Sequence, residues 1–222
     1  MPQIFTASAD TRLRAVALML IPFVLICGLS IGGFMDSSYD SLVGWVVDQP
    51  VPFSHKHHVG ELGIDCRYCH TGVETGPQAG LPATHICMTC HSQLFTGAPM
   101  LAPVRASLAS GTPLQWRRVA RLPDYVYFNH SIHISRGIPC EQCHGRVDQM
   151  PLTTQAHGFT MGWCLSCHRN PGPNLRPPDE VTRMDWSDWD KHPELHAGFA
   201  AQAMKVHHIE PAKLDDCALC HR

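Results

Sequence analysis

The first feature of the chain is an apolar stretch close to its N-terminus. Residues Ala15 to Met35 form an uncharged run that is long enough to cross a bilayer as one helix. Arg12 and Arg14 precede the run, and acidic residues follow it from Asp36 onward. Because positive charge near a membrane helix stays on the cytoplasmic side, we predict a single-pass inner-membrane anchor with a cytoplasmic N-terminus. The rest of the chain then lies on the periplasmic, exported side.

A long signal peptide would give a similar apolar run. No small-x-small cleavage signature follows the run, so an uncleaved anchor is favoured over a signal peptide. We therefore assign residues 1–36 to a cytoplasmic stub and the transmembrane anchor, and residues 37–52 to a linker.

Beyond the linker, one pattern of aromatic, polar and apolar positions occurs twice. Each copy reads Phe-x-His-x-x-His, continues to an isoleucine two residues before a C-x-x-C-H motif, and is followed by a further motif of that kind. The copies begin at Phe53 and Phe128, and their nearly constant spacing identifies an internal duplication. The sequence therefore predicts two modules, residues 53–91 and 128–168, separated by an inter-module segment over residues 92–127.

The two histidines of each copy are three residues apart. This spacing places them on one side of a helical turn. We therefore expect His55 with His58, and His130 with His133, to point into one shared space in each module.

The remaining residues, 169–222, form a C-terminal segment outside the duplication. The stretch Asn170–Pro178 is rich in proline and is predicted to be a stiff, extended linker. A helical stretch is expected from Trp186 and Trp189 onward. The predicted fold class is mainly α with much irregular loop, in addition to the N-terminal transmembrane helix.

The composition changes this picture, because the 222 residues include 16 His and 11 Cys. Ten of the cysteines lie in five C-x-x-C-H motifs, which we call sites 1 to 5 in chain order. The sites are Cys66/Cys69/His70, Cys87/Cys90/His91, Cys140/Cys143/His144, Cys164/Cys167/His168 and Cys217/Cys220/His221.

The C-x-x-C-H spacing is typical of covalent haem c attachment. Two thiols reach the two vinyl groups of one porphyrin, and the adjacent imidazole binds the iron. Zinc ribbons also use C-x-x-C pairs but need no histidine directly after each pair. Disulfides within each pair would leave the five histidines without a role. The sequence therefore predicts five haem c groups.

Five haems leave little room for an ordinary core. The exported part of the chain offers only about 35 residues per haem, so the porphyrins themselves are expected to fill the interior. The formal net charge of −2 argues against nucleic acid as a partner.

Each iron has two axial positions. The proximal ligands are expected to be His70, His91, His144, His168 and His221. The duplicated pairs supply four distal ligands, which leaves one iron to be completed. The candidates for that fifth distal ligand are Met161, Met150, His207 and His208. A methionine is favoured, and its thioether would raise the reduction potential of that haem.

This count bears on catalysis. Haem enzymes that act on small molecules keep one iron position open, whereas five proximal and five distal ligands leave none free. One-electron transfer needs only rigidly held, six-coordinate haems. The sequence therefore predicts an electron relay that has no catalytic residues and is not an enzyme on its own.

The Phe-x-His-x-x-His motif ahead of C-x-x-C-H resembles the small class III multihaem cytochromes c. In that family the first histidine commonly serves the following haem and the second serves another. The resemblance implies that His55 and His130 ligate the irons of sites 1 and 3, and that His58 and His133 cross to other sites.

Over longer strings the chain resembles the pentahaem cytochrome c subunit of alternative complex III. The resemblance rests on Pro52–His70, Leu122–His130 and Met161–Arg169, together with the single N-terminal anchor. It implies a subunit that relays electrons from quinol oxidation to a periplasmic cytochrome or copper carrier, or to a terminal oxidase. The implied partners are membrane-embedded quinol-binding subunits, an iron–sulfur protein and a monohaem cytochrome or terminal oxidase.

Two other classes share parts of this layout. A self-contained, membrane-anchored quinol dehydrogenase that feeds a periplasmic reductase has an anchor followed by haems, and it is the main alternative. Pentahaem nitrite reductases replace one proximal histidine with lysine, whereas every site here ends in histidine.

Overall fold

The computed structural model describes residues 6–35, 37–185 and 191–221. The chain divides into two compact units, with the boundary between Leu42 and Val43. Each unit is described by itself.

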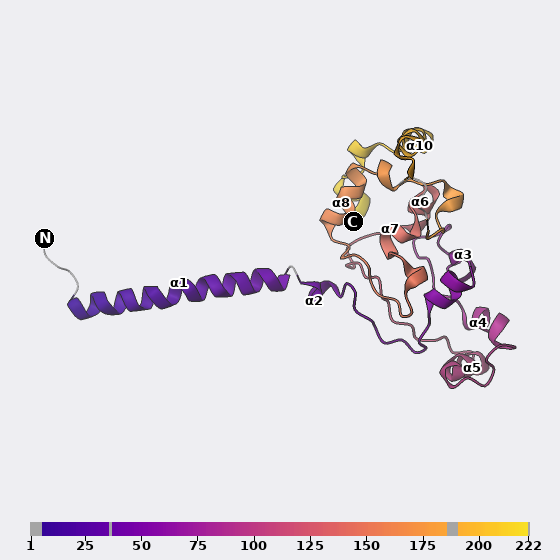
Figure 1. The fold of residues 1–222 in the computed structure, drawn as a ribbon, viewed down its shortest axis with the longest axis horizontal. Helices are drawn as coiled ribbons and strands as arrows, with labels where there is room; N and C mark the ends of the chain where they lie inside the picture. The colour runs from indigo at the N-terminus through magenta and orange to yellow at the C-terminus, as the bar shows by residue number, and fades with distance from the viewer. Residues whose placement is uncertain (1–5, 36, 186–190, 222) are drawn as a thin grey trace. The chain divides into compact units, whose positions relative to one another are not determined.

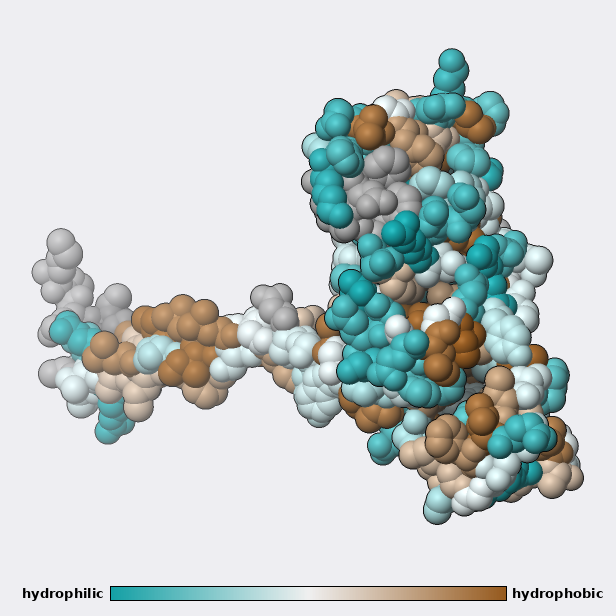
Figure 2. Space-filling view, turned by 45° about the vertical axis from the view of Figure 1, so that its right-hand side comes forward, coloured by the Kyte–Doolittle hydropathy of each residue, from teal (hydrophilic) through white to brown (hydrophobic). Residues whose placement is uncertain are grey.

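The first unit is dominated by one helix, α1, over Ala7–Met35. Its start is capped by Thr6, whose hydroxyl accepts a hydrogen bond from the backbone N–H of Ala9. The helix therefore begins eight residues before the apolar run and continues through Pro22. By length and composition α1 is able to cross a membrane, a test that a signal sequence also passes, and its visible face is largely apolar (Figure 2).

A short helical turn, α2 over Ser38–Ser41, follows and is capped by the Ser37 side chain. Asp36, the first acidic residue after the apolar run, lies outside the described residues.

The second unit consists of short helices joined by long irregular loops (Figure 1). Its α-helices are α3 (Cys66–Cys69), α4 (Thr84–His91), α5 (Ala102–Ser110), α6 (His130–Ser135), α7 (Cys140–His144), α8 (Met161–Arg169), α10 (Pro193–Val206) and α11 (Cys217–Cys220). A π-helical turn, η1, spans Lys56–Glu61, and 3₁₀ turns span Pro99–Leu101 (η2), Val147–Gln149 (η3), Gly172–Asn174 (η4), Pro178–Glu180 (η5) and Pro211–Lys213 (η6).

Strand structure is sparse in the described part of this unit. It consists of isolated bridges that pair Val43 with Gln155, Val46 with Thr154 and Val126 with His221. The prediction of a mainly helical chain with much irregular loop is therefore confirmed.

The aliphatic core of the second unit is divided into small clusters. One contains Val51, Leu101 and Val104, a second Val73, Ile134 and Val181, and a third Ile138, Leu175 and Ala203. Each cluster packs against one cysteine of a C-x-x-C-H motif: Cys87, Cys140 and Cys167 respectively. Apolar packing is thus concentrated next to the motifs.

The proline-rich stretch Asn170–Pro178 is not the extended linker that the sequence suggested. It forms the 3₁₀ turn η4 and leads into η5, and Leu175 between them is completely buried. The reason is that proline fixes a backbone angle that suits the first position of a helical turn as well as an extended chain. The expected helical start at Trp186 and Trp189 lies outside the described residues, and α10 begins at Pro193.

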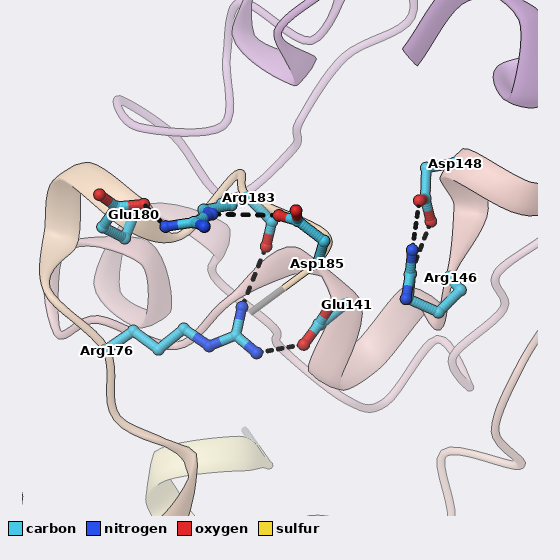
Figure 3. A network of polar contacts seen from close by, with 7 residues as sticks. All are labelled: Glu141, Arg146, Asp148, Arg176, Glu180, Arg183 and Asp185. Carbon is cyan, nitrogen blue, oxygen red and sulfur yellow. Dashed lines mark hydrogen bonds and ion pairs between the residues drawn. The ribbon is translucent and has the colours of Figure 1, made fainter. Parts of the chain in front are cut away.

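A buried ion pair ties this stretch to the helix of site 3. Arg176 is only 8% exposed, and its guanidinium contacts the carboxylate of Glu141 on α7 (Figure 3). Arg176 also donates to the backbone oxygen of Arg183 at 3.0 Å, and its own backbone N–H donates to the oxygen of Gly137 at 2.8 Å. The segment that follows site 4 therefore supports site 3.

Candidate haem sites

Phenylalanine separates the two histidines of the first module. The ring of Phe53 stacks on His58, with centroids 4.4 Å apart and planes 22° apart. It meets His55 edge-on, at 4.9 Å and 86°. The two imidazoles therefore point to different places, although they share one helical turn.

The second module repeats this arrangement around Phe128. Its ring stacks on His133 at 4.5 Å and 29°, and it meets His130 edge-on at 4.7 Å and 89°. The sequence contained the phenylalanine in both copies but gave it no role. It also suggested one shared space for each histidine pair, whereas the structure directs the two rings to different partners.

Each of these four histidines faces a histidine that ends a C-x-x-C-H motif. The pairs are His55 with His70 at 6.5 Å and 6°, His58 with His91 at 6.2 Å and 64°, His130 with His144 at 6.3 Å and 4°, and His133 with His168 at 6.1 Å and 29°. Two imidazoles that share a metal at about 2 Å per nitrogen have ring centroids roughly 6 Å apart. The spacing within each pair therefore fits one iron between the rings.

Hydrogen bonds at the other ring nitrogen fix the orientation of these imidazoles. Nδ1 bonds a backbone oxygen in His58 (Ser54, 2.9 Å), His70 (Gly80, 2.7 Å), His91 (Leu94, 3.2 Å), His130 (Pro77, 2.8 Å), His133 (Asn129, 2.8 Å), His168 (Leu214, 2.7 Å) and His221 (Tyr125, 3.2 Å). A carbonyl can only accept, so Nδ1 carries the proton and Nε2 keeps the lone pair that a metal needs. The tautomer of these seven rings is therefore the ligating one.

Burial keeps the imidazoles at the centre of the unit neutral. It lowers the pKa of His55 to about 4, with a further contribution from His70. Burial, followed by the neighbouring His130, also lowers the pKa of His144 to about 4. Neutral imidazole is the form that binds metal, so both side chains are ready for ligation at neutral pH.

Helical turns present the two thiols of each motif on one side. Cysteines three residues apart lie on the same face of a turn, and α3 and α11 consist of the C-x-x-C residues themselves. Asp65 caps α3 and Asp216 caps α11, each accepting a hydrogen bond from a backbone N–H two residues later at 2.8 Å. All eleven cysteines are free of disulfide bonds in the structure.

Contacts between motifs show which sites are neighbours. Sites 1 and 2 touch through Tyr68 and Thr89, whose hydroxyl oxygens are 2.9 Å apart and which each lie between the two cysteines of their motif. Burial raises the pKa of Cys69, and Cys87 of the other site raises it further by charge repulsion.

Sites 1 and 3 meet where the two modules join. The thiols of Cys66 and Cys140 are neighbours, and their interaction lowers the pKa of Cys66 and raises that of Cys140. The same short segment contacts both, because Val181 accepts from the backbone N–H of Cys140 at 2.9 Å and Thr182 lies 4.0 Å from the sulfur of Cys66. These two cysteines occupy equivalent positions in the duplication.

Sites 3 and 4 are neighbours within the second module. Their distal candidates share helix α6, and burial together with Cys167 and Cys164 raises the pKa of Cys143 to about 12.

Site 5 adjoins site 4. The loop that leads into site 5 accepts a hydrogen bond from His168 at Leu214, and it pairs Asp215 with Arg169 at 3.5 Å. Burial raises the pKa of Cys164, and Cys220 adds to this rise. The spatial order of the motifs is therefore 2, 1, 3, 4, 5, which differs from their order in the chain.

The ten motif cysteines differ in exposure. Cys90 on α4 and Cys217 at the start of α11 are exposed, whereas the other eight are partly buried. The physical reason is that sites 2 and 5 lie at the ends of the order and have one neighbouring site each. The Cys90 sulfur lies 3.9 Å from the hydroxyl oxygen of Thr89, the preceding residue in the chain.

The fifth proximal candidate, His221, has Tyr125 as its ring neighbour at 5.7 Å. Of the distal candidates, Met161 is the first residue of α8 and is 63% exposed. Met150 lies in the second module, where its sulfur is 3.9 Å from the Thr154 hydroxyl. The two histidine candidates follow the end of α10, where His207 is the C-cap residue.

Five C-x-x-C-H motifs on helical turns, with imidazoles spaced and oriented to flank an iron, define a multihaem cytochrome c. No protein-family model matches the chain. The chain is 30% identical over 191 residues to the multihaem cytochrome c subunit of menaquinone reductase from Nitratidesulfovibrio vulgaris (strain Hildenborough), which covers 79% of this chain and 77% of the relative. It therefore belongs to the family of multihaem cytochrome c subunits that includes that protein. The prediction of a multihaem cytochrome c is confirmed.

Proposed function

We propose that the chain is a pentahaem electron-relay subunit of a membrane-bound quinol:electron-acceptor oxidoreductase of the alternative complex III type. The observation that carries this proposal is the set of four imidazole pairs at 6.1 to 6.5 Å, each of which joins a distal histidine to the histidine of a C-x-x-C-H motif. Haem c, when bound, supplies reversible one-electron chemistry.

The side chains would hold these groups without leaving room for a substrate. At sites 1 to 4 one imidazole lies on each side of the metal position, so no open coordination position remains there for a small molecule. The chain is therefore proposed to be a relay and not an enzyme on its own. The small aliphatic clusters beside the motif cysteines support a core that haem groups complete.

The order of the sites gives the relay two ends. Sites 1 and 3 form the centre through Cys66 and Cys140, whereas sites 2 and 5 each have one neighbouring site. We propose that electrons enter at one of these ends and leave at the other. The exposure of Cys90 at site 2 and of Cys217 at site 5 supports this, because a redox partner must approach the first and last haems closely.

For site 5 we propose Met161 as the distal ligand. It lies three residues before Cys164 on α8, so the two residues share the face of α8 that adjoins Cys220. Met150 is less suitable, because its terminal methyl group lies near Gly145, beside the already paired His144 of site 3. His207 and His208 follow α10, which packs on η4 behind site 4.

The setting we propose is the periplasmic face of the inner membrane, with α1 as an uncleaved single-pass anchor and its N-terminus in the cytoplasm. The mean hydropathy of 2.5 over an 18-residue window of α1 and the two arginines ahead of the apolar run support this setting. The proposed partners are membrane-embedded quinol-binding subunits, an iron–sulfur protein and a monohaem cytochrome or terminal oxidase.

A second candidate is a self-contained quinol dehydrogenase that feeds a periplasmic reductase. The name of the relative, a menaquinone reductase subunit, also favours a variant of the first proposal in which electrons flow toward menaquinone. The direction of electron flow distinguishes the two variants of the relay subunit. The set of bound partners distinguishes the relay subunit from the self-contained dehydrogenase.

Purification in mild detergent tests the proposal. We expect five haems per chain by pyridine haemochrome assay, and we expect polytopic subunits and an iron–sulfur protein to co-purify. A single chain that oxidises quinol at the full rate of the complex would establish the second candidate instead. Reduction of the isolated complex by a quinol analogue, compared with its oxidation by a quinone analogue, gives the direction of flow.

A further inference from the structure

The two modules contact each other at the helical turns that contain their distal histidines. The backbone N–H of Lys56, next to His55, donates to Met150, six residues after the last residue of site 3. In the same way the N–H of Ser131 donates to Gly76, six residues after the last residue of site 1. The distances are 3.0 and 3.2 Å. Each module therefore holds the distal turn of the other in a reciprocal arrangement.

The first imidazole of each pair also bonds a residue of the other module, but the two hydrogen-bond partners differ in kind. Nδ1 of His130 lies 2.8 Å from the backbone oxygen of Pro77. Nδ1 of His55 lies 2.7 Å from the hydroxyl oxygen of Thr153 instead. A side chain of the second module thus takes the place that a backbone carbonyl occupies in the first.

We propose that Thr153 is a positioning residue for site 1, which acts through His55. This inference rests on the proposed role of His55 as an iron ligand. The Thr153 hydroxyl oxygen accepts a hydrogen bond from Nδ1–H of His55 and so leaves the Nε2 lone pair free to face His70, whose ring is parallel to within 6°. A hydrogen bond at Nδ1 also makes the imidazole a stronger electron donor, which stabilises ferric iron.

Thr153 is well placed for this role because its loop is fixed on both sides. On one side, Met150 accepts the N–H of Lys56. On the other, Gln155 is buried, with an exposed fraction of 5%, and its side chain bonds the backbone of Arg121 and His157. The hydroxyl is therefore held at a constant position relative to His55.

The test compares Thr153→Val, Thr153→Ser and Thr154→Val in the full-length holoprotein. Valine keeps the shape of threonine and removes the hydroxyl, whereas serine keeps the hydroxyl. The neighbouring Thr154 has the same chemistry, but its hydroxyl contacts the Met150 sulfur at 3.9 Å, so it is a matched control. EPR-monitored redox titration and haem content per chain are the readouts.

We expect Thr153→Val to raise the reduction potential of one haem among five, because the ferric form loses its stronger donor, and to weaken the EPR signal of that haem. Each tenfold preferential loss of ferric affinity corresponds to about 59 mV. Thr153→Ser and Thr154→Val are expected to match the wild type. The haem that shifts must be the one that changes in a His55→Met variant.

An unchanged set of five potentials in Thr153→Val would overturn the inference, and so would a shift in a haem other than that of His55. If Thr153→Val loses haem, Thr153→Ser decides the question: a wild-type potential and full haem content support the role of the hydroxyl, and a loss as large as in the valine variant contradicts it. Failure of the proposed function would be visible separately, as a wild-type protein without five haems or without bis-imidazole spectra.

Discussion

Replacing His58 with methionine is expected to change site 2 and to leave site 1 intact, although His58 is nearer to site 1 in the chain. The His58 ring faces His91 at 6.2 Å, and Phe53 holds it apart from His55. A thioether in place of the imidazole raises the reduction potential of the haem it ligates. One haem in five should therefore shift upward.

The angle between ring planes gives this haem a recognisable signature. Planes that are nearly parallel give a rhombic low-spin EPR spectrum, and strongly crossed planes give a spectrum with one large g value, because the two rings then compete for different iron d orbitals. The planes of His58 and His91 are 64° apart, whereas the other three pairs lie between 4° and 29°.

The assay is EPR of the oxidised protein before and after the substitution. We expect one large-g signal in the wild type, and its loss in His58→Met with the rhombic signals unchanged. The matched variant His133→Met should remove a rhombic signal and keep the large-g signal. If His58→Met removed a rhombic signal instead, the assignment of His58 to site 2 would be wrong.

Other changes test the supports of the sites. Asp65→Ala removes the cap of α3 and is expected to lower the free energy of unfolding by about 1 kcal/mol, measured by denaturant titration. Hydrogen bonds from Arg67 lower the pKa of Asp65 from 3.8 to about 2. The stabilising effect of the ionised carboxylate is therefore complete above about pH 5 and is lost as the pH falls toward 2, and an acid titration of the alanine variant should lack this step. Arg176→Met leaves the carboxylate of Glu141 without its buried partner and is expected to cost about 3 kcal/mol, whereas a cost near zero would show that the pair contributes little. Met161→Leu should abolish the near-infrared magnetic circular dichroism band of a methionine-ligated haem, and loss of that band in Met150→Leu instead would identify Met150 as the ligand.

Local chemistry made much of this protein predictable from its sequence. A C-x-x-C-H motif needs only residues within one helical turn, so attachment sites and proximal histidines could be predicted without knowledge of the fold. The apolar run and the duplicated histidine pairs are likewise short-range patterns. The resemblance to another family implied only that His58 crosses to another site, and its position beside His91 came from the tertiary structure, because nothing between them in the chain specifies it.

Other features depended on contacts between distant segments. The stretch around Leu175 was expected to be a stiff, extended linker. Its prolines suit both extended chain and helical turns, and packing against Ile138 and Ala203 decided between them. The exposure of Cys90 could not be foreseen either, because its motif has the same local pattern as the partly buried ones and only the position of site 2 at one end of the order sets it apart. The position of the Phe53 ring between His55 and His58 was likewise visible only in the structure, because a ring beside two histidines has no sequence signature of its own.

The sequence by itself thus determined the kind of site, the number of C-x-x-C-H motifs and the residues able to ligate iron, since these follow from covalent spacing. Only the tertiary structure decided their arrangement: the order 2, 1, 3, 4, 5, the contact between Cys66 and Cys140, and the placement of Thr153 against His55. The physical reason is that the two modules pack reciprocally. Each completes the surroundings of the turn that contains the other's distal histidines, across separations of 53 to 98 residues that no local pattern can encode.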